Sequence, residues 1–133
     1  MDINSKQVTI VLEAIATTCE ALITMSQQLR ANSQVESAMY SLNFRKYQPW
    51  GVMIELDVSA WLKKQDKSIS WWLEIGWNEG HWVIEHSILT NENDIQETLK
   101  EFETKTPQSI NELIEQLEEA TSDLITSLQI IVL

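Results

Sequence analysis

The chain has 133 residues, of which 44% are hydrophobic, with three glycines and two prolines. This length and composition predict one globular domain over residues 1–133, large enough to bury a core without disulfides or metals. Twenty acidic and nine basic residues give a net charge of −11. That charge argues against nucleic-acid binding, which depends on lysine and arginine contacts with phosphates. It fits a soluble protein or one that attracts a basic protein partner.

The single cysteine, Cys19, has no internal disulfide partner, and this favours a reducing compartment. It lies among apolar residues at helical spacing, which predicts a buried side chain rather than a reactive thiol. The first ten residues lack the basic and apolar regions of a signal peptide. Because no run of about 18 consecutive apolar residues occurs, we expect no membrane-spanning helix and a cytoplasmic protein.

An N-terminal helix is predicted to begin after Asn4, because Asn4 and Gln7 have the spacing of a capping box. The helix should end near Arg30 or Ala31, with Asn32 in the left-handed closing conformation. Its apolar stripe, at a period of about 3.6 residues, comprises Val8, Val11, Leu12, Ile15, Cys19, Leu22 and Leu29.

Alternating apolar and polar residues predict an antiparallel meander of three or four strands. The alternation is clear over residues 50–58, 69–77 and 81–89. Residues 34–47 fit two patterns: alternation favours a strand, whereas Val35, Met39 and Leu42 also have helical spacing. We favour the strand.

Register in the hairpin around Asn78-Glu79-Gly80 decides which residues face the core. Shifting one strand by a single residue moves its side chains to the opposite face. A bulge at Gly80 would favour such a shift, with Leu73 opposite Glu85. We instead expect the pairing that keeps the apolar residues together, namely Ile75–Trp82, Leu73–Ile84, Trp71–His86 and Ile69–Ile88.

Two further helices are predicted after the sheet. Asp94 and Glu97 repeat the capping-box spacing, which indicates a short helix lined by Ile95, Leu99 and Phe102. Thr106-Pro107 then opens a long C-terminal helix with an acidic face. The fold class is therefore α+β, with the helices packed on one sheet face. The apolar terminus IIVL is expected to pack on the domain or on a second copy, which suggests a homodimer through the C-terminal helix.

Motifs for enzymatic chemistry are missing from the sequence. His81 and His86 do not have a zinc-motif spacing, and residues five apart in a strand point to opposite faces. No G-x-S-x-G elbow and no glycine-rich phosphate loop occur. We therefore expect a non-enzymatic protein without a metal site or cofactor.

The outward face of the predicted sheet is the candidate for partner binding. Trp50, Trp71 and Trp82 should face the core, where large aromatic rings fill space. The residues expected on the outward face as partner-binding candidates are Glu55, Asp57, Trp72, Glu74, His81 and Glu85. An exposed tryptophan favours binding, since tryptophan is enriched at interface hot spots. The alternative is an ordinary solvated or covered sheet face.

In size, acidity and helix–sheet–helix order, the chain is similar to small acidic secretion chaperones and to bacterial immunity proteins. The leading hypothesis is accordingly a non-catalytic adaptor-, immunity- or chaperone-like module that engages a protein partner through its acidic face. One alternative is a small-ligand-binding protein or enzyme that uses His86 or the carboxylates of Glu55, Asp57 and Glu74. Another is a structural subunit of a larger assembly.

Overall fold

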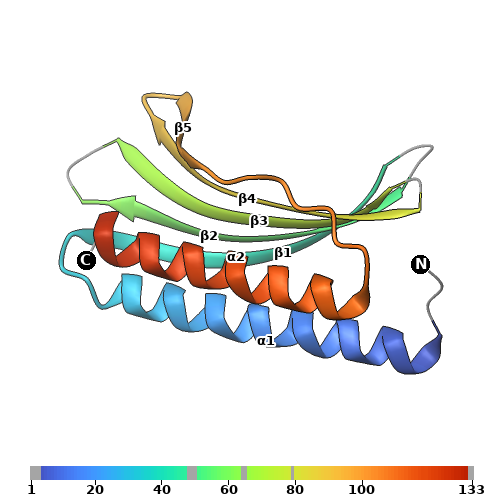
Figure 1. Ribbon diagram of the computed structural model, residues 1–133. Coiled ribbons are helices and arrows are strands. Elements are labelled where there is room, and N and C mark those ends of the chain that lie inside the picture. Colours follow the sequence, from blue (N-terminus) through green and yellow to red (C-terminus); the bar gives the residue numbers. More distant parts are fainter. Residues whose placement is uncertain (1–3, 48–50, 64–65, 79, 132–133) are drawn as a thin grey trace.

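The computed structural model describes residues 4–47, 51–63, 66–78 and 80–131. One five-stranded antiparallel sheet has its strands in sequence order, and a helix precedes and follows it (Figure 1). The elements are α1 (Ser5–Arg30), β1 (Val35–Tyr47), β2 (Gly51–Leu62), β3 (Lys67–Asn78), β4 (His81–Glu92), β5 (Ile95–Glu101) and α2 (Ile110–Ile131). The α+β class is confirmed, and the sheet has five strands rather than three or four.

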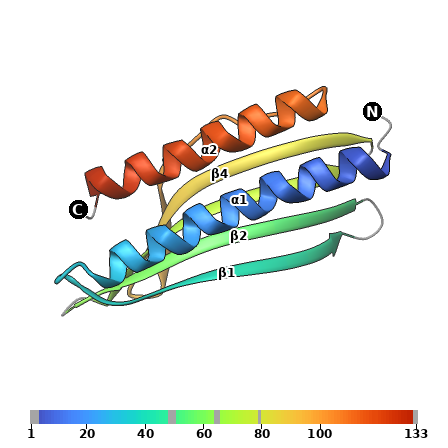
Figure 2. The ribbon, with the colours of Figure 1, turned by 90° about the horizontal axis from the view of Figure 1, so that it is seen from below.

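The two helices lie side by side on one face of the sheet and leave the other face without a helix (Figures 1 and 2). α1 contacts β1 and β2, whereas α2 contacts β3 and β4. We call the face covered by the helices the inner face and the opposite one the outer face. This two-layer arrangement buries one apolar side of the sheet, as the alternation of residues requires.

Helix α1 begins with the capping box that the sequence predicts. The Asn4 side chain accepts from the Gln7 amide at 3.0 Å, and the Gln7 side chain accepts from the Asn4 amide at 2.9 Å. The helix ends at Arg30 as expected. The left-handed closure at Asn32 is wrong, because the described non-glycine residues with positive φ are Asn93 and Asp94. Asn32 instead closes the turn with its side chain, which accepts from the Gln34 amide at 2.8 Å.

By length and composition alone, α1 is long and apolar enough to cross a membrane. The expectation of no such helix relied on unbroken apolar runs, which threonine and serine interrupt in α1. A core helix passes the same test, and α1 packs Leu22, Met25 and Leu29 into the core. About 28% of its most apolar 18-residue window is buried, so much of its apolar surface lies outside the core.

The strand interpretation of residues 34–47 is confirmed. β1 pairs with β2 along nearly its whole length, from Val35 opposite Leu62 to Tyr47 opposite Gly51. A bulge between Val35 and Ser37 shifts the pairing once near the start of the strand. Because its other side adjoins no strand, β1 forms one edge of the sheet.

The predicted register of the β3–β4 hairpin is wrong by two residues. Ile75 lies opposite Ile84, Leu73 opposite His86, Trp71 opposite Ile88 and Ile69 opposite Thr90. The faces are nevertheless as predicted, since a shift of two residues preserves side-chain parity. The physical reason is the tight connection, in which Asn78 lies opposite His81 and Gly80 takes a φ of +81°. The expected pairing would have centred the turn one residue earlier and placed Gly80 opposite Trp77, so that Gly80 could not serve as a turn residue.

The predicted short helix after Asp94 is wrong, because residues 95–101 form β5 against β4. Asn93 and Asp94 both have positive φ, 53° and 65°, as the central residues of a type I′ hairpin turn require. Every side chain of β5 is exposed. Asn93 and Asp94 therefore form the two-residue turn of a hairpin, and Asp94 does not cap a helix.

The long C-terminal helix begins at Ile110 rather than at Pro107. The hydroxyl of Ser109 accepts from the Glu112 amide at 3.1 Å, which is the bond of an N-terminal cap. Before the helix, Lys105 bridges to Ile84 through two backbone hydrogen bonds of 2.9 Å. This bridge continues the β4 edge beyond β5 and positions the chain for α2.

The core lies between the inner face and the two helices. Trp71 is fully buried and Trp82 is partly buried against the core, as predicted. Trp50 lies outside the described residues. Both helices and strands β1 to β4 contribute to the core, whereas β5 does not. The largest fully buried side chains are Trp71, Met25, Leu29, Leu56, Leu73, Ile75, Ile84, Ile88, Leu113, Leu117, Leu124 and Leu128.

Candidate functional site

The outer face carries all six residues predicted for partner binding. Strand alternation places them opposite the core-facing residues of the same strands, so the sequence pattern alone determines their side. The strands bend so that the outer face lies inside the curve (Figure 1). The six residues come from β2, β3 and β4 and are Glu55, Asp57, Trp72, Glu74, His81 and Glu85.

Three glutamates form a row across the middle of this face. Glu55 lies directly opposite Glu74, and Glu74 lies directly opposite Glu85. Directly opposed residues in antiparallel strands have Cβ atoms about 5 Å apart. All three side chains are partly exposed. The row therefore concentrates hydrogen-bond acceptors and negative charge within one cross-strand line.

Trp72 is bound to this row by a hydrogen bond. Its indole Nε1 donates to Oε1 of Glu55 at 2.7 Å, and Asp57 is its direct partner across the strands. The ring is partly exposed rather than covered by a helix. A flat apolar ring thus lies next to carboxylates, an arrangement that suits the guanidinium group of arginine, which stacks on aromatic rings and pairs with carboxylates.

Asp57 belongs to a small hydroxyl network that sequence reasoning missed. The Ser59 hydroxyl donates to Asp57 Oδ1 at 3.0 Å and lies 2.8 Å from the Ser70 hydroxyl. Burial raises the pKa of Asp57, the bond from Ser59 opposes that rise, and the charge of Glu55 adds to it. Ser59 and Ser70 are direct cross-strand partners, so the alternation that selected Asp57 could also have identified them.

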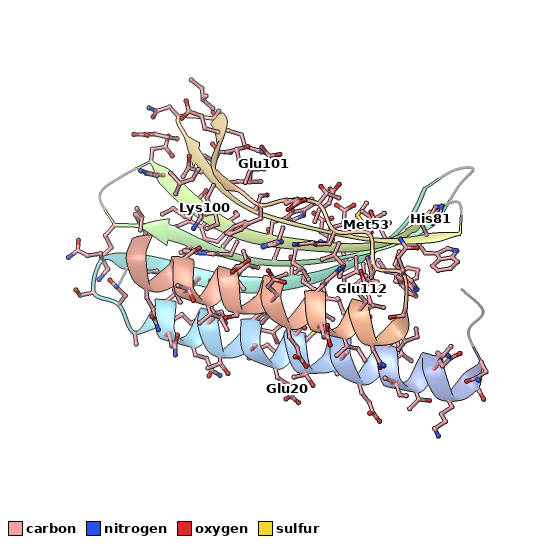
Figure 3. All side chains as sticks on the ribbon, viewed as in Figure 1. Glu20, Met53, His81, Lys100, Glu101 and Glu112 are labelled. Carbon is pink, nitrogen blue, oxygen red and sulfur yellow. The ribbon has the colours of Figure 1, made fainter. Side chains whose placement is uncertain are left out.

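The end of the outer face near the β3–β4 turn differs from its centre. His81 is exposed there, and Met53 lies at the same end of the sheet (Figure 3). Met53 is only 3% exposed although it is on the outer face. The expectation of an ordinary solvated face is therefore incomplete, because Met53 is as little exposed to solvent as the residues of the core.

His86 is separate from this surface. It points to the inner face, is buried, and stacks on the Phe102 ring with centroids 4.2 Å apart. Its Nε2 lies 3.1 Å from Asp123 Oδ2 of α2. Burial lowers the pKa of His86, while Asp123 and the charge of Glu119 oppose that shift. Asp123 was not predicted, because nothing in the local pattern of α2 distinguishes it from neighbouring acidic residues.

The described residues contain no group of three or more histidines, cysteines, aspartates or glutamates that could hold a metal ion. The glutamate row is a line of acceptors that runs across three strands. Burial also raises the pKa of the Cys19 thiol, which disfavours the thiolate that nucleophilic chemistry requires.

Several hollows lie on the helix side of the molecule. The largest, of about 480 Å³, is an open groove between α1 and α2 lined partly by Ala14, Thr17, Thr121 and Ile125. Of two smaller apolar hollows, one of about 140 Å³ lies between α1, Ile54 of β2 and Trp82 of β4, and one of about 200 Å³ lies between α1, β1 and β2. A fourth lies at the β4–β5 turn. His86 lines none of these four hollows.

In comparisons with protein-family models, curated proteins and solved structures, nothing matches this chain.

Proposed function

We propose that this chain is a non-catalytic interaction module whose outer face binds a basic segment of a protein partner. The observation that carries the proposal is the placement of both helices on the inner face, which leaves Trp72 and the glutamate row on a helix-free surface. The net charge of −11 attracts cationic partners over distance and speeds their encounter.

Arginine is the side chain that this surface suits best. Its guanidinium can donate two parallel hydrogen bonds to a carboxylate and can stack on an aromatic ring. Both groups are present here side by side, since Trp72 Nε1 donates to Glu55 Oε1 at 2.7 Å. Asp57 supplies a further acceptor, fixed by the Ser59 hydroxyl. An extended arginine-rich segment could therefore lie across β2, β3 and β4 and contact each carboxylate in turn.

The alternative of a small-ligand site or enzyme has less support. His86 faces α2, whereas Glu55, Asp57 and Glu74 face outward, so the sheet separates the two groups. The adaptor-, chaperone- and immunity-like possibilities share basic-partner binding, and this proposal covers that shared property.

Binding of a fluorescein-labelled oligo-arginine peptide, followed by fluorescence anisotropy, tests the proposal. The double variant Glu74→Gln/Glu85→Gln should raise the Kd about fivefold to tenfold, since each exposed ion pair contributes up to about 1 kcal/mol. Wild-type binding should weaken with added salt. Trp72→Ala should raise the Kd further, through loss of the stacking surface.

The matched control is Glu20→Gln/Glu115→Gln, which removes the same charge from exposed positions of α1 and α2. It should change the Kd less than twofold, because no outer-face contact is lost. If the control weakens binding as much as the outer-face variant, the peptide responds only to net charge and the proposed surface is wrong.

A further inference from the structure

The two edges of the sheet carry different kinds of side chain. β5 contains three charged residues, Glu97, Lys100 and Glu101, which is a common way to keep a strand edge from pairing with another chain. In β1, residues 37–44 contain no aspartate, glutamate, lysine, arginine, glycine or proline. The charged residues of β1, namely Glu36, Arg45 and Lys46, lie near its two ends. An uncharged, unbroken stretch of this length at a sheet edge is a template for another strand.

β1 also exposes large apolar side chains on the inner face. α1 contacts both β1 and β2, and the start of β1 is buried at Val35 and Ala38. In Figure 2 the far part of β1 lies to one side of α1. Tyr40, Leu42 and Phe44 are 48%, 59% and 71% exposed, although their direct partners in β2 face the core. The inner face is thus covered over most of β2, β3 and β4 but open at Tyr40, Leu42 and Phe44 of β1.

The neighbouring flank of α1 continues this apolar surface. Val8 and Leu12 are 44% and 57% exposed, and they line a hollow with Ile54, the direct partner of Phe44. A second hollow, of about 200 Å³, is lined by Cys19, Ile23, Tyr40 and Leu42 among others. We name Val8, Leu12, Tyr40, Leu42 and Phe44 the β1 patch.

We infer that the β1 patch and the β1 edge form the interface with a second copy of this chain, through antiparallel β1–β1 pairing into one continuous ten-stranded sheet. A two-fold axis at Ser41 would set Tyr40 opposite Leu42 of the second copy and the small Ala38 opposite its large Phe44. Even-numbered residues then remain on the inner face in both copies, as the pleat requires.

Charge and shape both favour a second copy as the occupant. Two chains of charge −11 repel least where the contacting surfaces carry no charge, and residues 37–44 are such a stretch. A lone strand from another protein would pair with the edge but leave Val8 and Leu12 uncovered. A second copy brings its own β1 patch, so that the two patches form one continuous apolar surface between the two α1 helices.

Cysteine cross-linking tests the predicted contact. In a Cys19→Ala background, Ser41→Cys would place two cysteines directly opposite each other, about 5 Å apart between Cα atoms, which is within disulfide reach. Oxidation should give a covalent dimer. The control is Thr98→Cys in β5, the other edge strand, which should stay monomeric under the same treatment. Cross-linking of Thr98→Cys but not of Ser41→Cys would overturn the inference.

Mass in solution gives a second test. By sedimentation equilibrium, the wild type should show twice the 15.4 kDa of one chain. Leu42→Lys should raise the dimer Kd about 100-fold or more, because two leucines lose their burial at a symmetric contact. Leu99→Lys in β5 is the matched control, since Leu99 is also an exposed leucine of an edge strand. Circular dichroism should show that both variants remain folded.

A wild type that sediments as one chain at every concentration would overturn the inference. A dimer that survives Leu42→Lys would do the same and would favour the C-terminal helix, whose contact with a second copy stays a prediction. The result is independent of the proposed function, since monomeric Leu42→Lys should still bind the oligo-arginine peptide through its outer face.

Discussion

The inner and outer faces of β2, β3 and β4 are built from alternate residues of the same segments, yet they differ in almost every physical property. Inner residues such as Leu56 and Leu73 are at most 2% exposed, whereas their neighbours Glu55 and Glu74 are partly exposed carboxylates. The inner face must bury apolar area for the chain to fold. The outer face is under no such requirement over most of its extent, so its residues are available for recognition.

The adjacent pair Trp71 and Trp72 gives the sharpest test of this difference, because the two rings point to opposite faces. Trp71→Ala should lower the free energy of unfolding by about 3–5 kcal/mol, through loss of a fully buried ring. Trp72→Ala should lower it by only about 1 kcal/mol, the usual contribution of one hydrogen bond. Urea unfolding followed by circular dichroism measures both. Equal losses would show that the outer face is as essential to folding as the core.

A smaller effect is expected from pH, through the one histidine on the inner face. The folded-state pKa of His86 is lowered by burial, so the unfolded chain binds more protons below its ordinary pKa of about 6.5. Stability that is present above that pH is therefore lost as the pH falls, by up to about 1.4 kcal/mol per pH unit. Asp123, Glu119 and Lys105 are the charged groups that act on this ring.

The variant His86→Gln should flatten this part of the pH profile, because glutamine keeps a donor toward Asp123 and takes up no proton. His81→Gln, on the exposed side of the hairpin, controls for loss of a histidine. The measurement is the free energy of unfolding between about pH 7 and pH 5. A profile that His86→Gln leaves unchanged would contradict this origin of the pH dependence.

The smallest effect should come from Asp57 on the outer face. Its folded-state pKa is raised above the ordinary 3.8, chiefly by burial, so the charged carboxylate lowers stability at neutral pH. Asp57→Asn should therefore raise the free energy of unfolding by up to about 1 kcal/mol at pH 7. That gain should disappear near pH 3.8. The exposed Asp66→Asn is the control, and a destabilised Asp57→Asn would show that its hydrogen bond with Ser59 outweighs the burial of charge.

Elements whose signal is local could be predicted from the sequence. The capping box at Asn4 and Gln7 marked the start of α1 correctly, and alternation identified β1 and both faces of the central strands. The same capping-box spacing at Asp94 failed, because two residues with positive φ close a hairpin there instead. Spacing alone cannot separate these outcomes, since aspartate and asparagine suit helix caps and tight turns equally.

Long-range features were less accessible. The apolar pattern of β3 and β4 fits any register that preserves parity, so the two-residue error came from the position of the turn rather than from the faces. The outer-face residues follow from parity alone, whereas the contact between His86 and Asp123 joins segments 37 residues apart. Likewise, no sequence pattern indicates that Tyr40, Leu42 and Phe44 of β1 stay exposed, because that depends on how α1 lies across the sheet.

The placement of α1 and α2 at opposite ends of the chain has a consequence for synthesis. β1 and β2 emerge from the ribosome after α1, the helix that packs against them, so their buried residues can be sheltered as the strands form. β3 and β4 emerge before α2, and Trp71, Ile84 and Ile88 have no helix to cover them until residues 110–131 follow. Exposed apolar surface on incomplete chains favours aggregation. The last part of this fold to be made is therefore the one on which the solubility of the nascent chain depends.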